Sequence, residues 1–168
     1  YLTGMFPDRE SAELAYQGVL DRGYDKDDVN LVMSKETRER HFSNEHGETT
    51  ELGNKAAEGA GIGAGLGGVI GAVGAAIAAV GTSIAIPGLG LVIAGPIAAA
   101  LAGAGAGGAA GGLVGALVGW GIPEERIKQY EGSIREGGIL MGVNPRNDED
   151  ATHLESNWRG ARGSDIYR

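Results

Sequence analysis

The sequence predicts an α+β protein in which a small α/β domain is interrupted by a long helical hairpin rich in glycine and alanine. Two observations lead to this prediction. The 168 residues include 32 glycines, roughly a fifth of the chain, where about 7% is usual. Residues 59–123 contain no charged or amide side chain, so every charge lies in the flanking segments. We therefore expect the first half of the domain at 1–34, a charged linker at 35–55, the hairpin at 56–121 and the second half of the domain at 122–168.

The first flanking segment predicts a strand, a helix and a second strand. Residues 2–6 (LTGMF) are a short strand candidate. Asp8 can cap a helix over residues 9–22, and Gly23 suits its end. The apolar residues at helical spacing are Ala12, Ala15, Tyr16, Val19 and Leu20. In DVNLVMS (28–34), every second residue is apolar, at Val29, Leu31 and Met33, which predicts a strand with one buried face.

The second flanking segment predicts helix, strand, helix and strand. Pro123 suits the first turn of a helix that carries Ile127, Tyr130 and Ile134 on one side. Gly137 and Gly138 end it, and residues 139–143 (ILMGV) form the next strand. Asp148 is the expected cap of a further helix, and residues 165–168 (DIYR) form an edge strand. The buried positions expected in that last helix are Ala151, Leu154 and Trp158.

These elements together predict a ferredoxin-like sheet with an additional helix, because the strand at 139–143 can pair beside the strand at 2–6. Each half is too small to bury a core alone. We therefore expect residues 1–34 and 122–168 to fold together. The insert between them then leaves the domain and returns to it at nearly the same place.

The insert is too long for one helix. About 65 residues at 1.5 Å each would extend roughly 98 Å, or about three bilayer cores. The stretch IAIPGLGLVIAGP (84–96) breaks it, so we expect one helix at about 56–83 and another at about 96–121. The expected turn residues are Pro87, Gly88, Gly90 and Pro96.

Glycines recur every four residues in both predicted helices, which places each row on one helix face. The two rows are Gly59, Gly63, Gly67 and Gly71, then Gly103, Gly107, Gly111, Gly115 and Gly119. The first helix also carries an apolar stripe, Ile62, Leu66, Val69, Ile70, Val73, Ile77 and Val80. This spacing predicts a glycine zipper, in which bare faces let helix backbones approach closely.

Other interpretations of the insert explain less. A silk-like stack needs glycine at every second position, which the pairs Gly107–Gly108 and Gly111–Gly112 break. A flexible linker would carry serine and polar residues in place of the apolar stripe. Each glycine costs roughly 1 kcal/mol relative to alanine inside a helix. Close packing of shielded helix backbones is the interaction we expect to offset that cost.

The order of features resembles the bacterial general stress proteins of the heat- or low-temperature-induced type, which contain a glycine-zipper hairpin. Three stretches carry the resemblance: GMFPDRESAELAYQGVLDRGYDKDDVNLVMS, AIPGLGLVIAGPIAAALAGAGAG and GALVGWGIPEERIKQYEGSIREGGILMGV. The last is the most specific, and the resemblance extends to Val143. It implies a stress-induced, membrane-linked, non-enzymatic protein, and it transfers no active site.

Membrane insertion of one isolated helix is marginal on energetic grounds. The seven apolar stripe residues supply roughly −2 to −4 kcal/mol at about −0.3 to −0.6 each, and alanine and glycine add little. A self-associated group of hairpins would insert better. Basic residues near both ends of the insert favour a bacterial inner-membrane location with the α/β domain in the cytoplasm. They are Lys35, Arg38, Arg40, Lys55, Arg126 and Lys128.

Few residues suggest chemistry. The net charge of −8 argues against nucleic-acid binding, and the chain has no cysteine. His41 and His46, with Glu45 between them, fit a solvated linker better than a metal site. Glu124 and Glu125 fit a helix first turn, and the glycines lack a phosphate-binding pattern. We expect no catalytic residues, cofactor or metal.

Three functional hypotheses remain from the sequence. The first is a membrane-associated, non-enzymatic protein that forms homo-oligomers through the zipper. The second is a soluble cytoplasmic assembly whose hairpins share an apolar interior. The third is a small-molecule sensor, which rests on analogy with other ferredoxin-like domains. Trp120, at the end of the insert, fits an interfacial anchor and a packing residue equally well.

Overall fold

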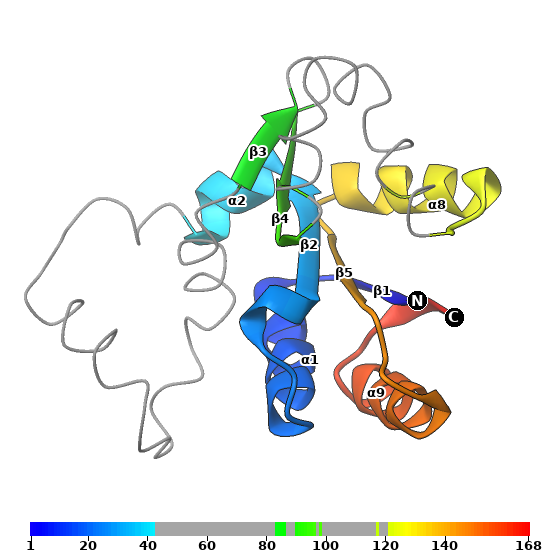
Figure 1. The fold of residues 1–168 in the computed structure, drawn as a ribbon. Helices are drawn as coiled ribbons and strands as arrows, with labels where there is room; N and C mark the ends of the chain where they lie inside the picture. Colours follow the sequence, from blue (N-terminus) through cyan, green and yellow to red (C-terminus); the bar gives the residue numbers. More distant parts are fainter. Residues whose placement is uncertain (43–82, 87–89, 97, 99–116, 118–120) are drawn as a thin grey trace, which may run out of the picture.

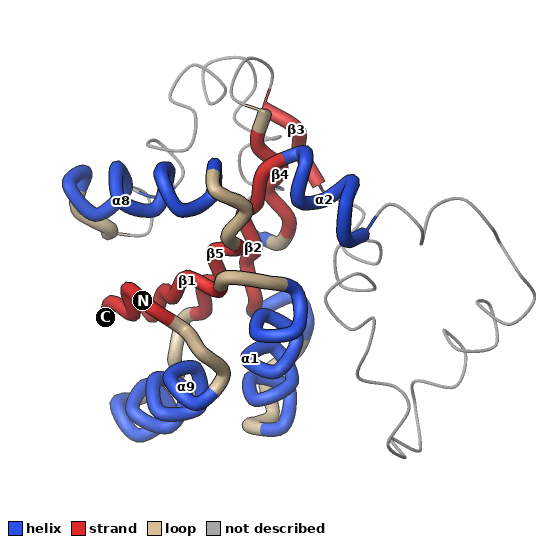
Figure 2. The backbone as a smooth tube through the Cα atoms, turned by 180° about the vertical axis from the view of Figure 1, so that it is seen from behind, coloured by secondary structure: helices blue, strands red, loops and turns tan. Residues whose placement is uncertain are grey.

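The structure is a computed structural model that describes residues 1–42, 83–86, 90–96, 98, 117 and 121–168. Within these residues, six strands form one antiparallel sheet in the order β3-β4-β2-β5-β1-β6. Helices lie on both faces of the sheet, and the two ends of the chain lie side by side (Figures 1 and 2). The predicted α+β class is therefore confirmed.

The first flanking segment folds largely as its pattern predicts. Strand β1 spans Leu2–Phe6 and helix α1 spans Arg9–Asp21. The side chain of Asp8 caps α1 by accepting a hydrogen bond from the Ser11 N–H at 2.9 Å. Gly23 follows the end of α1 with φ of 85°, a left-handed conformation that glycine adopts without strain. A short 3₁₀ turn at Lys26–Asp28 then leads into β2 at Val29–Ser34.

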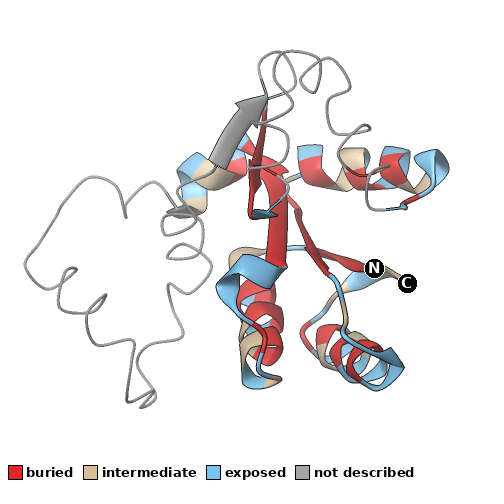
Figure 3. Cartoon of the chain, viewed as in Figure 1, coloured by how far each residue is buried: buried red, intermediate tan, exposed pale blue. Residues whose placement is uncertain are grey.

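Strand β2 is buried along its whole length, so the prediction of a strand with one buried face was wrong. Val29, Leu31 and Met33 do share one face, which packs in the same core as α1. Val32 lies in a second core on the opposite face. The reason is that helices cover both sides of the sheet, and Figure 3 shows β2 and its neighbour β5 as buried.

The second flanking segment contains the four expected elements. They are α8 (Glu124–Arg135), β5 (Ile139–Val143), α9 (Asp148–Gly160) and β6 (Ser164–Tyr167). Strand β5 pairs antiparallel with β1, from Leu2 opposite Val143 to Phe6 opposite Ile139. Asn147, and not Asp148, is the N-cap of α9, because its side chain accepts from the Asp150 N–H. Strand β6 lies at a sheet edge, as predicted, and its neighbour there is β1.

Residues 35–42 differ from the expected charged linker, because they form helix α2 (Lys35–Phe42) directly after β2. Ser34 Oγ accepts from the Thr37 N–H at 3.0 Å and so acts as a cap. The buried Thr37 hydroxyl in turn donates to the Gly137 carbonyl at 3.3 Å. These bonds fix α2 against the segment that precedes β5.

Two strands were not predicted, and both lie in the middle of the insert. Strand β3 spans Ser83–Ile86 and β4 spans Leu91–Ala94, so they occupy the expected turn of the helical hairpin. Strand β4 pairs with β2, from Leu31 opposite Ala94 to Ser34 opposite Leu91. The insert therefore returns to the sheet halfway along its length, and the expectation of a single departure and return was wrong. Sequence reasoning treated the apolar run LVIA as part of a turn because of the glycines and prolines around it.

The β1–α1 and β5–α9 units are equivalent in structure at one constant offset. Asp8 and Asn147 are the matching N-caps, and both have extended backbones. Ala12 and Ala151 match as buried residues one turn later. Gly23 and Arg162 match after the helix ends, with φ of 85° and 61°. Helices α1 and α9 pack against each other on one face of the sheet (Figure 1).

Candidate functional site

A buried carboxylate, that of Asp150, accepts hydrogen bonds from three side chains. It lies in the first turn of α9, where an acid is favoured by the helix dipole. Tyr24 donates to it at 2.7 Å, Arg22 Nε at 2.7 Å and Arg146 Nε at 2.9 Å. Arg22 Nη2 also donates to Glu149 at 2.9 Å. The cluster joins the end of α1 to the start of α9, across more than a hundred residues of sequence.

Every charged group of this Asp150 cluster has a partner. The Arg146 guanidinium lies 4.1 Å from the centre of the Tyr24 ring, and its Nη2 donates to the Arg22 carbonyl at 2.8 Å. The hydrogen bond from Tyr24, followed by those from Arg22 and Arg146, lowers the pKa of Asp150 to about 2. The carboxylate is therefore ionised at neutral pH and already fully bonded, which suits an anchor between segments better than a general base.

A second ion pair joins the opposite ends of the same two helices. Arg162, after the end of α9, donates to both carboxylate oxygens of Asp8 at 2.9 and 3.1 Å. Burial alone would raise the pKa of Asp8, but the hydrogen bonds from Ser11 and Arg162 outweigh it and lower that pKa. The end of each helix is thus tied to the start of the other. This reciprocal arrangement follows from the equivalence of the two β–α units.

On the other face of the sheet, the hydroxyl of Tyr130 also makes two hydrogen bonds within the domain. It lies 3.0 Å from Thr3 Oγ1 and donates to the Asp165 carbonyl at 2.8 Å. Burial raises the pKa of Tyr130, with the Thr3 hydrogen bond acting in the opposite direction. The phenol therefore stays protonated near neutral pH and holds α8 to β1 and β6.

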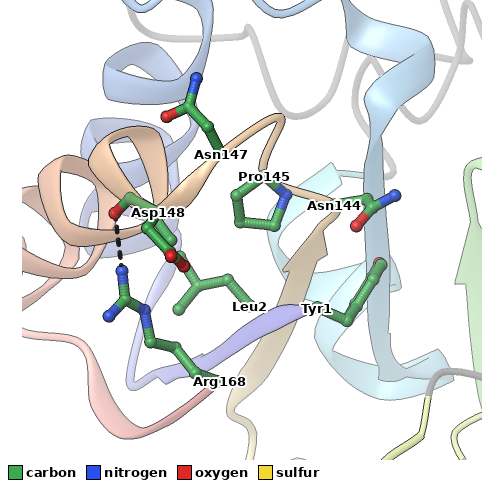
Figure 4. Close-up of a pocket in the computed structure, with 8 residues that line it drawn as sticks. Tyr1, Leu2, Asn144, Pro145, Asn147, Asp148 and Arg168 are labelled. Carbon is green, nitrogen blue, oxygen red and sulfur yellow. Dashed lines mark hydrogen bonds between the residues drawn. The ribbon is translucent and has the colours of Figure 1, made fainter.

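A pocket of about 420 Å³ lies where β5 leads into α9 (Figure 4). Its lining combines three apolar residues with two amides, a carboxylate, a phenol and a guanidinium. Arg168 donates to the Asp148 carbonyl at 2.9 Å and so borders the opening. The lining residues are Tyr1, Leu2, Asn144, Pro145, Asn147, Asp148, Ala151 and Arg168. This mixed lining suits a small, partly polar molecule and contains no paired nucleophile and base.

Most of the functional residues predicted from sequence lie outside the described residues. These are both glycine rows, the whole apolar stripe, and the turn residues Pro87 and Gly88. Gly90 is described and lies in a turn directly before β4, with φ of 62°. Pro96 is exposed, two residues after the end of β4. At Gly90 the chain therefore connects two strands, where a connection between helices was expected.

Some of the remaining predictions concern described residues, and others concern residues outside them. Glu124 and Glu125 lie in the first turn of α8 and Trp158 is fully buried, as expected. His46 and Glu45 lie outside the described residues, as does Trp120. Within the described ranges, no group of three or more His, Asp or Glu residues is placed to hold a metal ion. None of the helices described is long and apolar enough to cross a membrane.

Sequence reasoning missed the Asp150 cluster. The three acids in the first turn of α9 (Asp148–Asp150) were only weak evidence of a polar cluster. The helix dipole favours acids in any first turn, so they are common there. The sequence pattern could not identify the partners of Asp150, because Arg22 and Tyr24 lie far from it in the chain. Comparison of the chain with protein-family models, curated proteins and solved structures finds no match.

Proposed function

We propose that this chain is a non-enzymatic, self-assembling protein in which the α+β domain holds two glycine-rich arms, about 56–82 and 96–121. We further propose that the assembly associates with a bacterial inner membrane, with the domain on the cytoplasmic side. A role in stress follows from the resemblance described above. A soluble homo-oligomeric particle with the arms in a shared interior is the alternative outcome of the tests below.

The observation that carries this proposal is the way the described polar groups are used. The Asp150 cluster and the Tyr130 hydroxyl are bonded within the domain and tie its elements together. This bonding supports a structural role for the domain. The unusual feature of the sequence is its glycine content, which is concentrated in the arms, so we assign the assembly to them. Glycine at every fourth position from Gly103 to Gly119 suits close contact between helices.

A ferredoxin-like architecture is part of the proposal. The strands of the flanking segments stand in the order β2-β5-β1-β6, and all neighbours are antiparallel. Helices α1 and α9, which follow the two central strands, share one face. Two equivalent β–α–β units arranged in this way support the assignment. Strands β3 and β4, with α2 and α8, are then additions to it.

Leucine substitutions in the second arm test the zipper. Gly107→Leu and Gly111→Leu should reduce the size or yield of the assembly, because overpacking a close contact costs roughly 1–3 kcal/mol at each site. Ala109→Leu and Ala110→Leu, about 80–160° around the helix from that row, are the matched controls and should be tolerated better. Particle size is measured by light scattering with and without detergent. Equal behaviour of all four variants would remove the zipper from the proposal.

Fractionation separates the membrane protein from the soluble particle. Protein that stays with membranes after alkaline carbonate washing supports membrane association, whereas a large particle in the supernatant supports the alternative. The pocket beside α9 favours a third function, the sensing of a small, partly polar molecule. A thermal-shift screen of metabolites, repeated on Asp148→Asn, tests that function. If no metabolite in the panel raises the melting temperature, the result counts against it.

A further inference from the structure

The pocket beside α9 has the size and the apolar surface to hold a small organic molecule. Its volume of about 420 Å³ falls in the range of about 300–1,000 Å³ that is usual for ligand pockets. Leu2 and Ala151, which are both buried, line it together with Pro145. A bound molecule can therefore place carbon atoms against these three residues and remove apolar surface from water.

The two charged groups in the lining differ in whether they already have partners. Arg168 donates to the Asp148 carbonyl at 2.9 Å and to Thr152 Oγ1 at 2.8 Å. The Nε of the same guanidinium lies 3.6 Å from Glu155 Oε2. Among the described residues, the Asp148 side-chain carboxylate has neither a hydrogen bond nor an ion pair. The pocket therefore offers a bound molecule one unpaired negative charge.

The other side of the pocket also favours a cation. Figure 4 shows Tyr1 on the side of Pro145 opposite Asp148. The Tyr1 hydroxyl accepts from Asn30 at 2.9 Å, which holds the ring in place, and the face of an aromatic ring attracts cations. The start of α9 carries a partial positive charge of about half a unit, which opposes a cation, but the full charge of the carboxylate is larger.

We infer that this pocket binds a short aliphatic amine in its cationic form. The ammonium group lies beside the Asp148 carboxylate, and the carbon chain lies over Leu2 and Pro145. The inference rests on the small-molecule function proposed above, and it names the class of molecule for that function. It is independent of the glycine-rich arms and of assembly through them.

A series of three four-carbon probes tests which charge the pocket selects. At neutral pH, n-butylamine is a cation, n-butanol is neutral and butyrate is an anion, whereas their size and shape are similar. Each probe is titrated into the full chain at matched ionic strength, and the melting temperature is followed. Butylammonium should raise the melting temperature, and the other two probes should raise it less or not at all. A shift from butanol or butyrate as large as that from butylammonium would overturn the inference and leave the small-molecule function in place.

Two matched variants locate the bound amine. Asp148→Asn removes the charge and keeps the shape, so it should weaken butylammonium binding about two- to fivefold, as expected for an exposed ion pair. Glu149→Gln makes the same kind of change one residue later, outside the pocket lining, and should bind as the unchanged chain does. Urea unfolding of both variants checks that the fold is kept, and the probe series on the unchanged chain decides the question if it is not.

The remaining outcomes separate the inference from the function on which it rests. Equal binding by all three proteins, or equal weakening in both variants, would show that the amine responds to the general charge of the protein, and would overturn the inference. If none of the three probes and no metabolite in the screen raises the melting temperature, the small-molecule function fails, and the inference fails with it.

Discussion

The two faces of the sheet are closed by different parts of the sequence. On one face, α1 and α9 pack together over β1, β2 and β5, and nearly all the core residues come from the flanking segments. On the other face, α8 covers the sheet together with residues of the insert. The insert residues in that second core are Leu91, Ile93, Ala98 and Leu117. Among the described residues, the first face therefore takes only Val92 and Ala94 from the insert, whereas the second face takes four residues from it.

This difference shows that the insert is part of the domain as well as an addition to it. The first face is held by polar ties between α1 and α9, namely the Asp150 cluster and the Arg162–Asp8 ion pair. The second face depends on the burial of β4, an apolar strand in the middle of the insert. Changes to the insert should consequently affect stability through the second face, and changes to the polar ties should affect it through the first.

Deletion of the insert should have the largest effect. Removing residues 56–121 takes away β3 and β4, and with them Leu91, Val92 and Ile93, whose burial contributes roughly 1.5–3 kcal/mol each. This sum is comparable with the whole stability of a small domain, about 5–15 kcal/mol. The product should be aggregated or lack cooperative unfolding, as followed by circular dichroism.

The contrasting deletion removes only residues 56–80 and joins the ends with a short polar loop, which keeps β3 and β4. This variant should unfold cooperatively with a melting temperature close to that of the full chain. If the larger deletion unfolds as cooperatively as the smaller one, the flanking segments form a complete domain alone, and the comparison between the two faces fails.

An intermediate effect is expected from Tyr24→Phe on the first face. The hydroxyl of Tyr24 is the main cause of the lowered pKa of Asp150. An acid whose pKa is lowered on folding stabilises the fold above its ordinary pKa of about 3.9 and loses that contribution as pH falls through its folded value of about 2. In the variant the folded pKa rises toward the ordinary value, so the contribution at neutral pH is smaller, and its loss on acidification is smaller and is complete at a higher pH.

Thermal unfolding between pH 6 and pH 2 measures this shift. The melting temperature of Tyr24→Phe should be a few degrees lower at pH 6, and the difference from the unchanged chain should narrow as the pH falls to 2. Glu149→Gln, which removes an exposed ion pair with Arg22, is the control and should follow the profile of the unchanged chain. Identical acid profiles for all three proteins would show that the Asp150 cluster does not stabilise the first face.

The smallest effects should come from two helix glycines that differ in what surrounds them. A Cβ at Gly132 in α8 would meet nothing within 4 Å, so Gly132→Ala should stabilise the protein by about 0.5–1 kcal/mol. A Cβ at Gly18 in α1 would collide with the side-chain amide of Asn157 in α9. Gly18→Ala must displace that amide, so it should be less stable than Gly132→Ala, as measured by urea unfolding.

A double variant tests the reason for the second effect. The Oδ1 atom of Asn157 is buried and has no hydrogen-bond partner in the described part of the chain. Asn157→Ala should thus cost little and should restore Gly18→Ala to the stability of the parent or above it. If the double variant is as unstable as Gly18→Ala alone, the close approach of α1 and α9 has another cause.

The sequence by itself determined the elements whose signals are local. Asp8 before an amphipathic run fixed the start of α1, Gly23 its end, and Ile127, Tyr130 and Ile134 the buried side of α8, because capping and periodicity act within a few residues. Only the tertiary structure decided the burial of both faces of β2, the pairing of β4 with β2, and the partners of Asp150. These features depend on residues that are distant in the chain. Four apolar residues between glycines and prolines fit a turn, a helix or a strand equally well until a neighbouring strand supplies hydrogen-bond partners.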